Sequence, residues 1–158
     1  MYWSIQGNFG LGKAIEYFTS KSIPVSVPLN DTQKYDLVVD IDNKLYRVSV
    51  KTSRAQNENG TYTVALKKCG GTGKSNYVQL FDNTSCDYVF ALLGNNKTYL
   101  IPSDKIESTT GITIGNKYTE YEVESDTLAD FINKTIDAAN VRRCGDVLND
   151  GKEVSFEN

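Results

Sequence analysis

One aspartate and one lysine lie on neighbouring runs of strand-forming residues and could act together in catalysis. Asp36 stands near the start of the first run, and Lys51 lies near the end of the second. The Asp42-Asn43 pair between the runs is typical of a β-hairpin turn. With those two residues as the loop, Asp36 faces Ser49, and the alternation of side chains places Asp36, Ser49 and Lys51 on one face. A carboxylate and an ammonium group therefore meet at the open end of the predicted hairpin.

The opposite face of this hairpin is apolar and predicts where the core lies. The face that carries Asp36 also carries Val38, Asp40, Leu45 and Arg47. An isolated Asp36–Lys51 pair would be a surface ion pair that contributes little to stability, so the surrounding chain decides between that interpretation and a reactive site. The predicted core face consists of Leu37, Val39, Ile41, Tyr46, Val48 and Val50.

Composition excludes several classes of site. The chain contains no histidine, which excludes histidine-based triads, histidine metal clusters and histidine general bases. Its three cysteines, Cys69, Cys86 and Cys144, are scattered without Cys-x-x-Cys spacing, which argues against zinc and fits a reducing compartment. No apolar run approaches the roughly 20 residues of a membrane span, and the first residues do not resemble a signal peptide. We therefore expect a cytoplasmic protein with no membrane partner.

Hydrophobic periodicity predicts one α+β domain over residues 1–158, built on a mixed β-sheet flanked by helices. The length of 158 residues suits a single domain with a substantial core. Apolar residues at helical spacing predict an N-terminal helix and a C-terminal helix, and alternating or continuous apolar runs predict the strands between them. The expected helices cover residues 8–21 and about 126–140, and the expected strands cover 23–28, 35–41, 44–53, 61–68, 76–80, 87–93 and 98–102, with further β-structure over 111–124.

The charge of the chain is unevenly distributed. Its net charge is −3, but residues 44–79 contain seven basic residues and one acidic residue, a net charge of +6. Residues 104–158 contain twelve acidic and six basic residues, a net charge of −6. A basic middle and an acidic tail are compatible with one DNA-facing surface and one solvent-facing surface. The alternative is an ordinary fluctuation of charge on a solvated surface.

A glycine-rich segment at residues 70–75 resembles a P-loop only superficially. That motif requires Gly-x4-Gly-Lys-Ser/Thr, and its first glycine would stand at the position of Lys68. Lysines and glycine amides suit phosphate oxygens, so this segment favours contact with DNA phosphates. The strands around it predict a β-hairpin over residues 61–80, and a two-stranded ribbon fits the major groove. The candidate DNA-binding residues are Arg54, Thr61, Thr63, Lys67, Lys68, Lys74, Asn76 and Gln79.

An ordered set of blocks over about residues 8–106 resembles a known nuclease superfamily. The order is a helix, a strand, a strand that carries Asp36 and a strand that carries Val50-Lys51, and it resembles the core of the PD-(D/E)XK superfamily, which has the restriction-endonuclease fold. The finer pattern resembles the branch that contains bacterial group I intron-encoded homing endonucleases. Its blocks are Gly10-x-x-Lys13-Ala14-Ile15-x-Tyr17-Phe18, Val25-x-Val27-Pro28, Tyr35-Asp36-Leu37-Val38-Val39 and Tyr46-Arg47-Val48-x-Val50-Lys51-Thr52-Ser53.

The resemblance implies a site for phosphodiester hydrolysis. It implies that the Asp36 carboxylate and the Val50 carbonyl hold Mg²⁺, and that Lys51 orients or deprotonates the attacking water. Two catalytic positions depart from the branch: Leu11 stands where a glutamate is usual, and Ser49 stands where Glu or Gln is usual. Three explanations remain open: a weak or one-metal site, an inactivated variant, or a domain that binds DNA without cutting it.

These observations predict a Mg²⁺-dependent endonuclease that cuts double-stranded DNA at a specific sequence, with homing as its biological role. Cutting both strands takes two active sites, so we expect a homodimer or a dimer of dimers, with the C-terminal helix as the assembly surface. A restriction, resolvase or repair nuclease of the same fold is one alternative. A catalytically impaired DNA-binding protein is the other, and the changes at positions 11 and 49 favour it.

Overall fold

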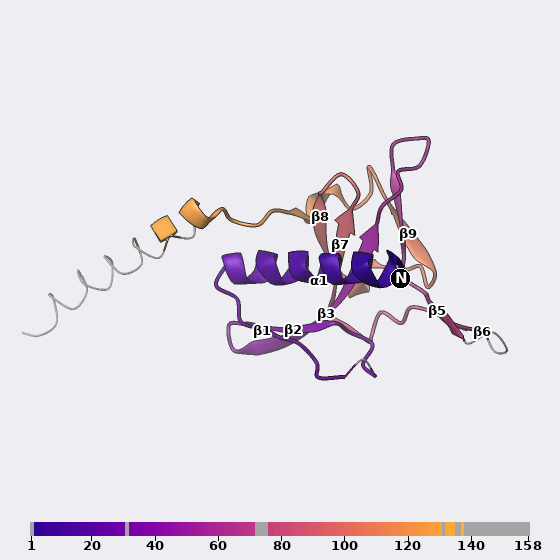
Figure 1. The fold of residues 1–158 in the computed structure, drawn as a ribbon, viewed down its shortest axis with the longest axis horizontal. Helices are drawn as coiled ribbons and strands as arrows, with labels where there is room; N and C mark the ends of the chain where they lie inside the picture. The colour runs from indigo at the N-terminus through magenta and orange to yellow at the C-terminus, as the bar shows by residue number, and fades with distance from the viewer. Residues whose placement is uncertain (1, 31, 72–75, 131, 135–136, 138–158) are drawn as a thin grey trace, which may run out of the picture. The chain divides into compact units, whose positions relative to one another are not determined.

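The computed structural model describes residues 2–30, 32–71, 76–130, 132–134 and 137, and Figure 1 traces its course. Two compact units succeed one another along the chain, Met1–Ser125 and Asp126–Asn158. The first unit contains the sheets, the long helix and every candidate site residue. Within the described part of the chain, no helix is both long enough and apolar enough to span a membrane.

The N-terminal helix α1 runs over Tyr2–Ser20, so it begins six residues before the predicted start at residue 8. Asn8, which has the chemistry of a helix cap, lies inside it. The buried side chains Ala14, Tyr17 and Phe18 recur at helical spacing and form the inner face of α1. The Ile23 amide donates to the Phe18 carbonyl at 3.0 Å and closes the C-terminal end. Helical periodicity therefore predicted the presence of the helix correctly and its start incorrectly.

A six-stranded mixed sheet forms the centre of the first unit, in the order β1-β2-β3-β7-β8-β10. Strands β3 and β7 are parallel, and every other pair in this sheet is antiparallel. Asp42 and Asn43 have φ angles of 53° and 61°, the left-handed conformation of a tight hairpin turn, which confirms the predicted loop. The strands are β1 (Val25–Ser26), β2 (Leu37–Ile41), β3 (Lys44–Ser53), β7 (Tyr88–Leu93), β8 (Thr98–Pro102) and β10 (Glu122–Val123).

Both faces of this sheet are covered. Helix α1 packs on the apolar face predicted from the hairpin, where Leu37, Val39 and Val48 are fully buried (Figure 1). A small antiparallel sheet of β4 (Tyr62–Ala65) and β9 (Gly111–Ile114) packs with the other face. That second layer covers one end of the face that carries Ser49 and Lys51, which the hairpin pattern alone did not predict. A second core lies between this layer and the six-stranded sheet, and its buried residues include Val64, Leu66, Cys86, Val89, Ala91, Ile101, Ile106, Ile112 and Ile114.

The hairpin predicted over residues 61–80 is present only in its second half. Strand β5 (Lys68–Gly71) pairs with β6 (Asn76–Gln79), and Lys68 stands opposite Gln79. The prediction for residues 61–65 is wrong, because β4 pairs with β9 instead. The physical reason is burial: Val64 lies opposite Ile112, and both side chains belong to the second core. Two short 3₁₀ turns, Ser103–Lys105 and Thr119–Tyr121, complete the first unit.

The C-terminal helix predicted over about residues 126–140 lies only partly within the described residues. Residues 128–130, 132–134 and 137 are helical. The Asp130 amide donates to Thr127 Oγ1 at 3.2 Å, and the Thr127 hydroxyl donates to Asp130 Oδ2 at 2.6 Å, a reciprocal cap at the helix start. Leu128 and Ile132 are exposed. Their role in assembly stays a prediction.

Substitution by alanine is expected to have opposite effects on stability at two glycines of α1. A Cβ atom at Gly10 would lie 2.3 Å from Thr52 Oγ1, whereas a Cβ at Gly12 meets nothing within 4 Å. We expect Gly10→Ala to lower the free energy of unfolding by about 1–3 kcal/mol through overpacking. We expect Gly12→Ala to raise it by about 0.5–1 kcal/mol, because alanine is the better helix former. Urea denaturation followed by circular dichroism measures both, and equal effects would contradict the close helix–strand contact.

Candidate active site

Asp36 is held at the open end of the β2–β3 hairpin. Its amide donates to the Val48 carbonyl at 2.9 Å, which continues the antiparallel pairing and places Asp36 opposite Ser49. Strand β3 extends beyond the start of β2, so the Val50 amide has no strand partner on that side. The Asp36 carboxylate replaces the partner: Oδ2 accepts from the Val50 amide at 2.6 Å and from Ser49 Oγ at 3.2 Å. The register predicted from the turn is therefore present, and it fixes the carboxylate against β3.

The Val50 carbonyl lies on the same side of β3 as this carboxylate. In a β-strand the amide and carbonyl of one residue point to the same side. Because the Val50 amide points to Asp36, the Val50 carbonyl also faces the side where β2 has not yet begun. The carbonyl predicted as a metal ligand is thus directed to the same side of β3 as the predicted carboxylate ligand.

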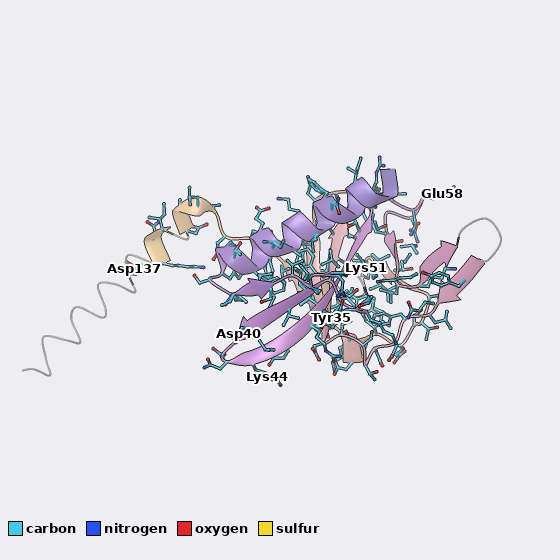
Figure 2. All side chains as sticks on the ribbon, turned by 60° about the horizontal axis from the view of Figure 1, so that its bottom comes forward. Tyr35, Asp40, Lys44, Lys51, Glu58 and Asp137 are labelled. Atoms are coloured by element: carbon cyan, nitrogen blue, oxygen red, sulfur yellow. The ribbon has the colours of Figure 1, made fainter. Side chains whose placement is uncertain are left out.

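Lys51 is half-buried. It follows Ser49 on the same face of β3, at the end of the hairpin remote from the turn. Figure 2 shows Lys51 and Tyr35 at one end of the hairpin and Asp40 and Lys44 at the other. Burial lowers the pKa of the Lys51 ammonium group, and the nearby charge of Lys68 acts in the same direction, whereas Asp36 opposes it. Among the described residues Lys51 has no hydrogen-bond or ion-pair partner. A lysine in this environment releases a proton more readily than an exposed one.

A small pocket opens in front of Ser49 and Lys51. Lys68 and Gln79, which stand opposite each other at the base of the β5–β6 hairpin, line this pocket. The structure therefore brings two predicted DNA-binding residues to two of the predicted catalytic residues, Ser49 and Lys51. Lys34 and Asp82 also line the pocket, and the sequence analysis did not identify them. The sequence feature that could have identified Lys34 is its position two residues before Asp36. Asp82 lies in a segment whose residues indicate only a turn.

The other predicted site residues do not converge on this pocket. Leu11 packs against the apolar cluster beneath α1, on the opposite face of the sheet from Ser49 and Lys51. Arg54 is exposed and lines a separate groove beside Phe9 and Gly94. Lys67 is exposed. Position 11 therefore contributes packing, and no carboxylate, to this structure.

The remaining predicted DNA contacts lie elsewhere. Thr61 and Thr63 each accept a hydrogen bond from Asn57 Nδ2, at 2.8 Å and 3.1 Å, and line a polar surface groove. Asn76 begins β6. Lys74 lies outside the described residues. These candidates remain predictions.

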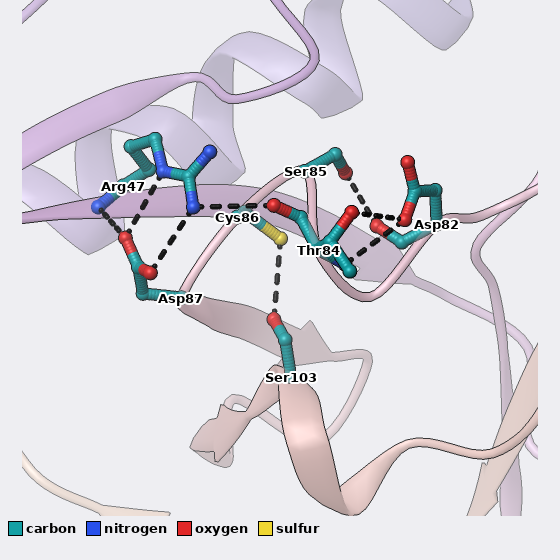
Figure 3. Close-up of polar contacts among 7 residues, drawn as sticks. All are labelled: Arg47, Asp82, Thr84, Ser85, Cys86, Asp87 and Ser103. Atoms are coloured by element: carbon teal, nitrogen blue, oxygen red, sulfur yellow. Dashed lines mark hydrogen bonds and ion pairs between the residues drawn. The ribbon is translucent and has the colours of Figure 1, made fainter.

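Two pairs of polar side chains, Arg47 with Asp87 and Cys86 with Ser103, are in contact near the start of β7 (Figure 3). Asp87 Oδ2 accepts from the Arg47 amide at 2.7 Å and from Nε at 3.1 Å, and Oδ1 accepts from Nη2 at 3.2 Å. This guanidinium contact lowers the pKa of Asp87. The buried Cys86 Sγ lies 3.2 Å from Ser103 Oγ, and burial raises the pKa of the thiol. Asp87 is thus engaged in joining β7 to β3, and Cys86 stays a protonated part of the core at neutral pH.

The donors at this site fit one hard divalent cation. Within the described part of the chain, no cluster of three or more His, Cys, Asp or Glu side chains occurs. Asp36 Oδ1 has no hydrogen-bond partner among the described residues, and the Val50 carbonyl is directed to the same side of the strand. Magnesium is commonly bound by one or two carboxylates together with substrate phosphates, and it keeps several waters. A single carboxylate beside a carbonyl is therefore a sufficient protein contribution when the substrate supplies further oxygens.

Comparison with known proteins agrees with the fold and with the ordered sequence blocks. The structure is similar to that of a bacterial homing endonuclease, I-Ssp6803I, with a TM-score of 0.66 and 22% sequence identity, covering 75% of this chain and 87% of that one. No curated protein matches the chain significantly. The sequence profile of the PD-(D/E)XK endonuclease family matches residues 4–133, which include Asp36, Ser49 and Lys51. This match confirms the predicted superfamily and the predicted restriction-endonuclease-like α+β fold. The chain belongs to the PD-(D/E)XK endonuclease family.

Proposed function

We propose that this chain is a Mg²⁺-dependent endonuclease that cuts both strands of DNA at a specific sequence, in the manner of an intron-encoded homing endonuclease. The observation that carries the proposal is the fixed Asp36 carboxylate, bonded by the Val50 amide and Ser49 Oγ, beside the half-buried Lys51. Family membership supports a DNA substrate and a divalent metal ion. The likeness of the fold to a bacterial homing endonuclease supports the choice of biological role.

Each residue of the site has a distinct role in this proposal. Asp36 Oδ1 and the Val50 carbonyl hold Mg²⁺, which when bound polarises the scissile phosphate and lowers the pKa of its water. Lys51 orients or deprotonates the attacking water, and its ammonium form offsets charge that develops on the phosphate. The Ser49 hydroxyl, buried to 2% exposure, donates to Asp36 Oδ2 and keeps the carboxylate in place. Ser49 thus acts here by positioning.

DNA recognition falls to the β5–β6 hairpin beside this site and to basic and polar residues elsewhere on the surface. The β5–β6 hairpin is a two-stranded ribbon of the kind that enters a major groove, and its base already lines the catalytic pocket. Tyr77 is exposed on β6 and adds an aromatic surface. Double-strand cutting then takes at least two copies of the chain, as a homodimer or a dimer of dimers, acting in the cytoplasm. The proposed DNA contacts are Arg54, Thr61, Thr63, Lys67, Lys68, Lys74, Asn76 and Gln79.

Plasmid cleavage tests the proposal directly. Incubation with Mg²⁺ of supercoiled plasmid that carries the two sequences flanking the gene, joined with the gene and any enclosing intron removed, is expected to yield linear DNA with discrete ends, and EDTA is expected to prevent it. Nicked circles alone would contradict double-strand cutting, and cleavage in EDTA would contradict the metal requirement. A group I intron around the gene would support homing; its absence would favour a restriction, resolvase or repair nuclease.

A second candidate function is DNA binding without cleavage. It is favoured by Leu11, which packs against the apolar cluster where the branch has a glutamate, and by the short Ser49 side chain. Under this alternative, Mg²⁺ produces no cut in any plasmid, yet the protein binds duplex DNA with a steep dependence on salt concentration. The same two assays therefore separate the two candidates.

A further inference from the structure

The pocket in front of Ser49 and Lys51 concentrates positive charge in an acidic protein. Three lysines line it, Lys34, Lys51 and Lys68, with Asp82 as the one carboxylate among its described lining residues, whereas the whole chain has a net charge of −3. Lys34 lies between β1 and β2, and Lys68 begins β5, so segments far apart in the sequence contribute these charges. We propose that Lys34 is a further DNA-binding residue of this site, whose ammonium group contacts a backbone phosphate beside the scissile one. This inference rests on the proposed function.

Electrostatics explains why an anion belongs in this pocket. Lys51 and Lys68 line the same pocket, and Lys51 is partly removed from water. Cations gathered in this way lower their mutual repulsion when an anion binds between them. Duplex DNA presents a row of phosphates, so several lysines around one pocket can each meet a phosphate at once.

A weak ion pair, which a phosphate can replace, holds Lys34 near the pocket. Lys34 Nζ lies 3.4 Å from Asp82 Oδ2, and the two side chains are 53% and 44% exposed. Asp82 is itself anchored, because its Oδ1 accepts from the Thr84 amide at 3.0 Å and from Thr84 Oγ1 at 2.6 Å. An exposed ion pair contributes little to stability. Lys34 can therefore exchange Asp82 for a phosphate at small cost, while Asp82 holds it at the pocket until DNA arrives.

The salt dependence of DNA binding tests this role. We compare the full-length wild type, Lys34→Gln and the control Lys105→Gln on a short random-sequence duplex in EDTA, so that no strand is cut. Lys105 is a matched control because it is exposed and lies 3.7 Å from an exposed aspartate, Asp104, but does not line this pocket. Loss of one phosphate contact makes the slope of log K against log salt shallower by about 0.9. The wild type then loses about threefold more affinity than Lys34→Gln for each fourfold rise in salt concentration.

Asp82→Asn supplies a second, opposite readout. Asparagine keeps an acceptor for Thr84 but removes the negative charge that competes for Lys34, so this variant is expected to bind DNA more tightly than the wild type. A slope for Lys34→Gln equal to that of a DNA-binding wild type would overturn the inference and leave the proposed function standing. Weaker DNA binding by Asp82→Asn would also overturn it. A wild type that does not bind DNA would overturn the proposed function, and this inference with it.

Discussion

Asp36→Asn is expected to lower the rate of DNA cleavage by at least about 10³-fold while the protein stays folded and binds DNA. The metal's stabilisation of the transition state is worth several kcal/mol, and each 1.36 kcal/mol is a factor of ten in rate. Asparagine retains one carbonyl oxygen for the Val50 amide and the Ser49 hydroxyl, but it removes the charge and the Oδ1 ligand. Single-turnover plasmid cleavage measures the rate, and a thermal melt checks the fold.

Two comparison variants separate charge from structure at this position. Asp40→Asn changes an equally half-buried aspartate on the same face of β2, at the turn end of the hairpin, and should cut DNA at the wild-type rate. Asp36→Ala leaves the Val50 amide without its acceptor and should also cost about 1 kcal/mol of stability. Equal losses of activity in Asp36→Asn and Asp40→Asn would show that general negative charge, and no specific ligand, is needed.

Lys51→Met is expected to reduce cleavage by about 10²- to 10⁴-fold, the range of general acid–base catalysis, and at the same time to stabilise the fold. Methionine preserves the linear side chain but removes a charge that burial disfavours. Removal of a functional, destabilising group typically raises the free energy of unfolding by about 0.5–1 kcal/mol. Single-turnover cleavage and urea denaturation measure the two effects. Lys44→Met, on an exposed residue of the same strand, should change neither by a comparable amount.

The stability gain of Lys51→Met has a defined pH dependence. The pKa of Lys51 is lower in the folded chain than in the unfolded chain, so the unfolded chain binds more protons between the two values. Wild-type stability therefore rises with pH in that window. The advantage of Lys51→Met is complete below the folded pKa of Lys51 and disappears above the unfolded value, about 10.4. An advantage that grows with pH would contradict a lysine destabilised by burial.

The β2–β3 hairpin was predictable because every feature that defines it is local. Asp42 and Asn43 favour a tight turn, side chains alternate with a period of two, and apolar residues occupy one face. Those rules alone place Asp36 opposite Ser49, and the structure has that register. The ordered blocks added the family, because the same helix and strands recur in the same order.

The surroundings of the hairpin depended on contacts between distant segments. The residues of β4 by themselves do not indicate whether this strand pairs with β6 or with β9. It pairs with β9 because this pairing buries Val64 in the second core. The parallel pairing of β3 with β7 brings Asp87 to Arg47, across forty positions of the chain. Such pairings are set by which surfaces can be buried together, and a single sequence does not state them.

The sequence by itself determined the nuclease family and the hairpin that carries the proposed catalytic pair, Asp36 and Lys51. Only the tertiary structure decided what surrounds that pair. Leu11 of α1 packs against the opposite face of the sheet, and Lys34, Lys68 and Asp82 come together around a pocket. The physical reason is the range of the interactions. Turn chemistry and strand alternation act over a few residues, whereas the pocket exists because two cores, one on each face of the sheet, draw separate segments of the chain together.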